Sequence, residues 1–180
     1  NAYDAAIAIS FTLAVVLPRA GNIGGGGFMV LHDIKSKKNY AIDYREKAPL
    51  LSTTDMYLDE NGTVILNKST LGYLSSGVPG TVAGMWAVHQ KFGSMEWDKL
   101  VRPAIKLASD GFEISPYMSD MLIKYNAKLS VFEETKNIFQ KQYPIFSGEL
   151  FVQVDLAKTL SVIADNGRDG FYKGSVAKKI

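Results

Sequence analysis

The four consecutive residues Asp43-Tyr44-Arg45-Glu46 carry the most distinctive chemistry in this sequence. They lie at the end of a predicted strand, so Arg45 would project from the edge of a sheet. A guanidinium offers two parallel donors to a carboxylate, a geometry that lysine cannot copy. Arg45 is therefore a candidate for binding a substrate carboxylate. The alternative is a surface ion pair between neighbouring charges, which contributes little to stability.

A run of four glycines, residues 24–27, precedes another predicted strand, at 28–33. A phosphate-binding loop needs the order strand, loop, helix, with the helix N-terminus facing the anion. The order here is reversed, no Gly-Lys-Ser/Thr follows, and Asn22 and Ile23 break the dinucleotide-binding pattern. The pattern therefore disfavours a nucleotide site. It leaves open a structural turn or a loop packed under an active site, because glycine lets another backbone approach closely.

The remaining reactive residues give no second catalytic candidate. The chain has no cysteine, and its two histidines, His32 and His89, have no partner at the spacing of a metal site or a catalytic triad. Ser75-Ser76-Gly77 does not match the Gly-x-Ser-x-Gly turn of hydrolases. Glu133-Glu134 is typical of a solvated helix face. The sequence thus predicts neither a metal nor a cofactor.

Composition excludes two further classes of function. The 20 Lys and Arg residues against 18 Asp and Glu residues leave a net charge of +2, without the basic excess that nucleic acid binding requires. The apolar run at 5–17 is shorter than the roughly 20 residues that a bilayer requires. No basic residue precedes it, as one would in a signal peptide. We therefore predict a buried helix that Pro18 stops, and no membrane span in this segment.

The elements that must position Arg45 are one hairpin among helices. Strands are predicted at 28–33, as a buried strand, and at 40–44, and Asn61-Gly62 marks a tight turn. Helices are predicted at 5–17, 82–92 with Thr81 as cap, 97–109, 116–125 and 156–164 with Asp155 as cap, with a short helix and loop at 130–150. Because two strands alone do not form a stable sheet, the hairpin must join strands from elsewhere. We expect residues 1–180 to be a single incomplete α+β domain without an internal boundary.

Several long strings resemble one known family. They are Asn1-Ala2-Tyr3-Asp4-Ala5-Ala6-Ile7-Ala8, Ala20-Gly21-Asn22-Ile23-Gly24-Gly25-Gly26-Gly27-Phe28-Met29, Asp43-Tyr44-Arg45-Glu46-Lys47-Ala48-Pro49, Gly77-Val78-Pro79-Gly80-Thr81-Val82-Ala83-Gly84 and Asp155-Leu156-Ala157-Lys158-Thr159-Leu160. In this order they resemble the large subunit of γ-glutamyltranspeptidase, also called glutathione hydrolase, of the bacterial type. The resemblance covers essentially the whole chain.

The resemblance implies an N-terminal-nucleophile hydrolase with an αββα sandwich, made as a precursor that cleaves itself into a large and a small subunit. The nucleophile would be the threonine that begins the small subunit, with its own α-amine as the base. No catalytic residue would then lie in residues 1–180. Arg45 matches the family arginine that pairs with the α-carboxylate of the γ-glutamyl group. The partner would be the small subunit, and the location would be periplasmic or secreted.

The reaction implied is transfer of a γ-glutamyl group, from glutathione or another γ-glutamyl amide, to water or an amino acid through a γ-glutamyl-threonine ester. Two alternatives stay open. One is a relative with another substrate, either an acylase of the cephalosporin type or a poly-γ-glutamate transpeptidase. The other is a catalytically inactive member that acts as a scaffold or binding protein.

Overall fold

The computed structural model describes residues 1–139 and 144–180, and it is a mixture of helices and short strands. Internal contacts divide the chain into two compact units. Unit 1 comprises Asn1–Asn22 and Val88–Ile180, and unit 2 comprises Ile23–Ala87. The single domain that the sequence suggests stays a prediction. Within the described ranges, no helix is both long and apolar enough to cross a membrane.

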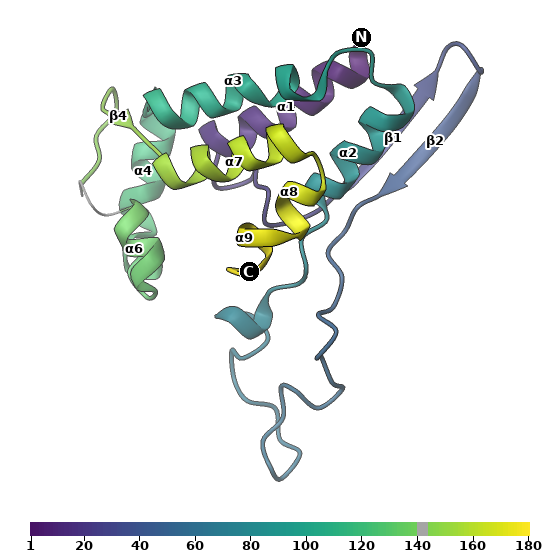
Figure 1. Ribbon diagram of the computed structural model, residues 1–180. Helices are drawn as coiled ribbons and strands as arrows, with labels where there is room; N and C mark the ends of the chain where they lie inside the picture. The colour runs from purple at the N-terminus through teal and green to yellow at the C-terminus, as the bar shows by residue number, and fades with distance from the viewer. Residues whose placement is uncertain (140–143) are drawn as a thin grey trace. The chain divides into compact units, whose positions relative to one another are not determined.

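Unit 1 is mainly helical. Helix α3 (Trp97–Asp110) contacts both α1 (Ala2–Val16) and α7 (Val154–Asn166), and Figure 1 shows the three lying alongside one another. The other elements are α4 (Pro116–Lys124), α5 (Asn126–Leu129), α6 (Glu133–Phe139), α8 (Asp169–Tyr172), α9 (Gly174–Ala177), β3 (Phe112–Glu113) and β4 (Leu150–Phe151). β3 pairs with β4 in antiparallel fashion.

The core of unit 1 consists of apolar side chains at helical spacing. Its buried members include Ile7, Phe11, Val15, Trp97, Leu100, Val101, Ala104, Ala108, Leu160 and Ile163. A smaller cluster comprises Ile114, Met118, Leu122, Ile145 and Phe151. The Trp97 indole packs edge-on against Phe11, with ring centroids 5.5 Å apart, and its Nε1 donates to the Ile163 carbonyl at 2.9 Å. The helix predicted at 97–109 is confirmed, and it buries Leu100, Val101, Ala104 and Ala108.

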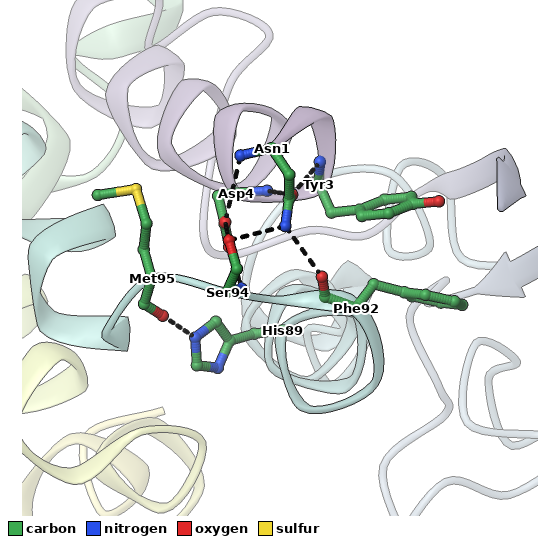
Figure 2. Close-up of polar contacts among 7 residues, drawn as sticks. All are labelled: Asn1, Tyr3, Asp4, His89, Phe92, Ser94 and Met95. Carbon is green, nitrogen blue, oxygen red and sulfur yellow. Dashed lines mark hydrogen bonds and ion pairs between the residues drawn. The ribbon is translucent and has the colours of Figure 1, made fainter. Parts of the chain in front are cut away.

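The start of α1 is tied to the loop between α2 (Thr81–Phe92) and α3, as Figure 2 shows. Asn1 caps the helix, because its Oδ1 accepts from the Tyr3 and Asp4 backbone N–H groups at 2.8 and 2.9 Å. The Asp4 carboxylate is buried and accepts from Ser94 Oγ at 2.6 Å and from Ser94 N at 3.1 Å. The cap and the carboxylate together fix where α1 begins.

Two predicted helix caps are wrong, although the helices themselves are confirmed. Asp155 lies inside the first turn of α7, where its carboxylate pairs with Lys158 at 2.9 Å, and Gln153 is the residue before the helix. Thr81 is the first residue of α2, and its hydroxyl donates to the Gly25 carbonyl at 3.0 Å instead of capping. Ser115 caps α4, because its Oγ accepts from Met118 N at 3.2 Å, and Pro116 is the first residue of that helix.

The expected short helix and loop at 130–150 is confirmed in part. Helix α6 supplies the helix, and residues 144–149 are irregular. Residues 140–143 of this expectation lie outside the described residues. The short strands β3 and β4 were not expected, because two residues are too few for a visible alternation of apolar and polar side chains.

Unit 2 begins with the predicted hairpin, formed by β1 (Phe28–Asp33) and β2 (Lys38–Asp43). The register pairs Phe28 with Asp43 and Asp33 with Lys38. The expectation that 28–33 is a buried strand is wrong: its residues alternate between exposed and half-buried, and Phe28 and Val30 are 64% and 81% exposed. The strand is apolar on both faces, but the described chain shields only one of them.

The rest of unit 2 is largely irregular up to the start of α2. It contains a 3-10 helix, η1 (Tyr73–Ser75), and a bridge between Leu58 and Val64 that closes the predicted turn at Gly62, where φ is 78°. Several leucines in this stretch are largely exposed, such as Leu50 and Leu66. The local folds here depend on turns and backbone contacts more than on a core.

Candidate functional site

Arg45 is the first residue beyond the paired part of the hairpin. Tyr44 N donates to the Gly27 carbonyl at 3.0 Å and so extends the ladder by one residue. The Arg45 N–H instead turns back to Asp43 Oδ1 at 2.9 Å. This side-chain turn at Asp43 ends the strand and directs the next residues away from β1. The expected placement of an arginine at a strand end is thus confirmed.

The guanidinium of Arg45 is held on one side only. Its side chain is 62% exposed, its Nε donates to Glu46 Oε2 at 3.1 Å, and its Cζ lies 5.8 Å from the centre of the Phe28 ring. In the part of the chain that the structure describes, the two terminal nitrogens have no hydrogen-bond partner. The neighbouring ion pair therefore exists, and the two terminal nitrogens still face solvent as a free fork for an incoming carboxylate.

Charges around this fork are well defined at neutral pH. The pKa of the Glu46 carboxyl is lowered, first by a hydrogen bond from the Glu46 backbone N–H and then by the hydrogen bond from the Arg45 side chain. Burial raises the pKa of the Tyr44 hydroxyl, which keeps that side chain neutral. Glu46 is thus ionised and holds the Nε edge, while Tyr44 adds no charge. A ligand carboxylate would meet the positive, terminal edge of Arg45.

Backbone hydrogen bonds join the segments around Arg45: the glycine run, the start of α2, and the two segments that contain Lys47 and Val78. The Gly25 carbonyl accepts from Gly80 N at 2.8 Å and from Thr81 N at 3.0 Å. Lys47 and Val78 form a pair of backbone hydrogen bonds, at 3.1 and 2.7 Å. The glycine run is therefore joined to the start of α2 through the Gly25 carbonyl. The Gly25 carbonyl thus takes up the first N–H group of α2, that of Thr81.

The other residues that the sequence singled out have structural contacts. His32 Nδ1 lies 2.7 Å from Asn39 Oδ1 across the hairpin. His89 Nε2 donates to the Met95 carbonyl at 2.8 Å (Figure 2), and its ring lies 5.3 Å from that of Trp97. Ser75 Oγ donates to the Gly72 carbonyl at 2.6 Å. Among residues 1–139 and 144–180, no three His, Cys, Asp or Glu side chains come together as a metal site.

Sequence reasoning missed the aromatic ring beneath the guanidinium. Phe28 could have been found from the hairpin register, because it pairs with Asp43, two residues before Arg45.

Unit 1 holds a separate apolar pocket of about 360 Å³, whose lining includes Leu17, Tyr117 and Met121. Its lining includes Arg19 and Lys128 but no residue of the hairpin, so it is not part of the candidate site at Arg45.

Comparison with known proteins places this chain in a family. The family model for gamma-glutamyltranspeptidase matches residues 1–180. The glutathione hydrolase proenzyme of Escherichia coli strain K12 is 47% identical over 182 residues, covering 100% of this chain and 31% of the relative. That of Bacillus subtilis strain 168 is 41% identical, again over 100% of this chain and 31% of the relative.

A solved structure agrees with these matches. The crystal structure of Helicobacter pylori gamma-glutamyltranspeptidase superposes with a TM-score of 0.95 at 49% identity, covering 99% of this chain and 52% of that one. The fold is that of the N-terminal-nucleophile hydrolases, as expected. The chain belongs to the γ-glutamyltranspeptidase family. It spans 31% of the length of the two curated relatives, which are named as proenzymes.

Proposed function

We propose that this chain is the N-terminal part of the large subunit of an enzyme that transfers γ-glutamyl groups from glutathione and similar amides to water or amino acids. The family match over all 180 residues supports this assignment. Relatives that cover the whole chain at 41–47% identity are named glutathione hydrolase proenzymes, which fits a precursor that is cut into two subunits. The small subunit would be the partner of this chain.

Arg45 would bind the α-carboxylate of the donor. The observation that carries this role is the fork described above: Glu46 holds Nε, and the two terminal nitrogens are open. A carboxylate bound there would form two parallel charge-assisted hydrogen bonds. Because the α-carboxylate and the γ-amide belong to the same glutamyl group, binding the first restricts where the second can lie relative to a nucleophile.

The nucleophile would come from outside this chain. A threonine hydroxyl at the start of the small subunit would attack the γ-carbonyl carbon while its own α-amine takes the proton. The C–N bond then breaks, the amine leaves with a proton, and a γ-glutamyl ester remains. Water or an amino-acid amine attacks this ester and regenerates the threonine. Residues 1–180 would contribute recognition of the donor to this sequence.

The full gene product tests this function. Intact mass and N-terminal sequencing should show two chains, the second beginning with threonine. Glutathione, a glutaryl amide and poly-γ-glutamate, assayed side by side, should show turnover of glutathione. Preference for the glutaryl amide or the polymer would instead favour the acylase or the polymer transpeptidase. A single uncleaved chain without turnover would favour the inactive scaffold and contradict the proposal.

We also propose a periplasmic or secreted location. The family resemblance is its support. Cell fractionation with a compartment marker should find the cleaved protein outside the cytoplasm, and a purely cytoplasmic pool of active enzyme would contradict this.

A further inference from the structure

We infer that Gly26 and Gly80 are positioning residues for Arg45: they allow two backbone segments to close on the main chain of residues 44–45 and so set where the guanidinium lies. The inference rests on the role proposed for Arg45. It adds two residues that do not touch the donor themselves. All of these residues belong to unit 2.

Gly26 lies directly against the arginine backbone. A Cβ atom at Gly26 would come within 2.8 Å of Arg45 Cα and 2.9 Å of Arg45 C. Real Cβ atoms essentially never approach other heavy atoms closer than 3.0 Å. The obstructing atoms belong to the main chain, so no side-chain rotation could relieve the overlap. Any side chain at Gly26 would therefore push residues 44–45 away.

Gly80 closes on the same stretch of main chain. Its Cβ atom would overlap the Tyr44 carbonyl oxygen and lie 2.7 Å from the Arg45 carbonyl oxygen. The backbone N–H of Gly80 also donates to the Gly25 carbonyl at 2.8 Å, which joins this segment to the glycine run. The two contacts on residues 44–45 are thus coupled through one hydrogen bond.

The side chain of Tyr44 is fixed by two other glycines. A Cβ at Gly84 would lie 2.5 Å from Tyr44 Cβ, and one at Gly27 would lie 3.0 Å from the edge of the ring. A residue whose main chain and side chain are both confined has little freedom to rotate. Because Arg45 follows Tyr44 directly, this confinement fixes the direction in which the Arg45 side chain leaves the backbone.

Space, and not backbone conformation, explains the need for glycine here. Neither Gly26 nor Gly80 has a positive φ. Gly24, in the same run, also lacks a positive φ and would place a Cβ with nothing within 4 Å. The four consecutive glycines are therefore not equivalent, and Gly24 provides a matched control.

The test uses the whole precursor, with Gly24→Ala, Gly27→Ala, Gly26→Ala, Gly80→Ala and Arg45→Leu purified as cleaved protein. Each is assayed with a γ-glutamyl anilide that has a free α-carboxylate and with the same donor as its α-amide. The readout is the ratio of the two kcat/KM values. A general loss of stability lowers both values together, whereas misplacing Arg45 lowers only the first.

We expect the ratio to fall about tenfold to a hundredfold in Gly26→Ala and Gly80→Ala, since displacement of a positioning group by about 1 Å has effects of this size. Gly24→Ala should keep the wild-type ratio. The ratio for Gly27→Ala should lie between that of Gly24→Ala and that of Gly26→Ala. If the Gly80→Ala precursor is not cleaved into its two subunits, the ratios measured for Gly26→Ala and Gly27→Ala test the inference. If the ratio is unchanged in these glycine variants but falls in Arg45→Leu, the inference about the glycines is overturned and the proposed role of Arg45 stands. An unchanged ratio in Arg45→Leu would overturn the proposed role of Arg45 and this inference with it.

Discussion

Unit 1 buries a continuous set of apolar side chains from α1, α3 and α7, whereas the buried residues of unit 2 all lie between residues 79 and 85. The hairpin and the segment that carries Arg45 contain only exposed and half-buried residues. Unit 2 nevertheless has many backbone hydrogen bonds between its segments, such as those from Gly80 and Thr81 to Gly25. Side-chain volume defines unit 1, and main-chain contact defines the surroundings of Arg45.

This difference teaches how each region should respond to substitution. In unit 1 the removal of side-chain volume should be costly, because packed interiors relax only partly around a cavity. Around Arg45 the addition of volume should be costly, because segments approach each other at glycine. Substitutions in the two units should therefore separate stability from donor recognition.

The largest expected effect on stability is that of Phe11→Ala. Phe11 is fully buried and packs edge-on against Trp97. We expect a loss of about 3–5 kcal/mol in the free energy of unfolding. Ile9→Ala, on the same helix at 57% exposure, is the control and should change it little. Urea unfolding of the whole protein measures both, and equal losses would contradict the core described for unit 1.

Asp4→Asn should have the next largest effect. Burial alone would raise the pKa of Asp4, but hydrogen bonds from the Ser94 hydroxyl and backbone N–H, with smaller contributions from the α-amine of Asn1, outweigh it and lower this pKa. An amide cannot accept these bonds in the same way, so we expect a loss of about 1.5–3 kcal/mol at pH 7. Asp165→Asn, at an exposed position of α7, is the control.

The effect of Asp4→Asn should also depend on pH. The folded-state pKa of Asp4 is lower than the unfolded one, so the unfolded chain takes up the proton first as pH falls. The stabilisation by the carboxylate is therefore complete at neutral pH and declines below about pH 4. Unfolding curves at pH 7 and pH 3 should show the gap between wild type and variant narrowing. A gap that widens in acid would contradict this reasoning.

Val30→Ala should have the smallest effect of the three. Val30 is 81% exposed on the hairpin, and a substitution at such a position changes the free energy of unfolding by about 0.5 kcal/mol or less. A value as large as that of Phe11→Ala would mean that another part of the whole protein covers this face. The same urea experiment thus tests whether this face of the hairpin stays exposed in the whole protein.

Within unit 1, the sequence predicts the long helices better than the short strands and the helix caps, for a physical reason. Helix α3 shows its buried face in the spacing of Leu100, Val101, Ala104 and Ala108, so its position follows from local pattern. The pairing of Phe112 with Phe151 does not, since it joins segments far apart in the chain. The cap expected at Asp155 is absent because the helix begins two residues earlier than expected, at Val154, which places Asp155 in its first turn.

The candidate site was predictable in part. Asp43 and Arg45 at a strand end could be placed from the sequence, and the family resemblance supplied the role of the arginine. The glycine run left two interpretations open, because the approach of Gly26 and Gly80 to residues 44–45 is a tertiary contact. No spacing within the run distinguishes Gly24 from Gly26. Only the fold shows which glycine lies against the arginine backbone.

The central claim is that the Arg45 guanidinium binds the donor α-carboxylate, and Arg45→Lys tests it most directly. Lysine keeps the charge and loses the planar fork. Steady-state kinetics of the whole enzyme should show kcat/KM for γ-glutamyl donors reduced about tenfold or more, since hydrogen bonds to charged groups contribute about 1.5–3 kcal/mol. The two subunits should still form and assemble, as mass and gel filtration would show. Unchanged kinetics across donor concentrations in the assembled variant would contradict the claim.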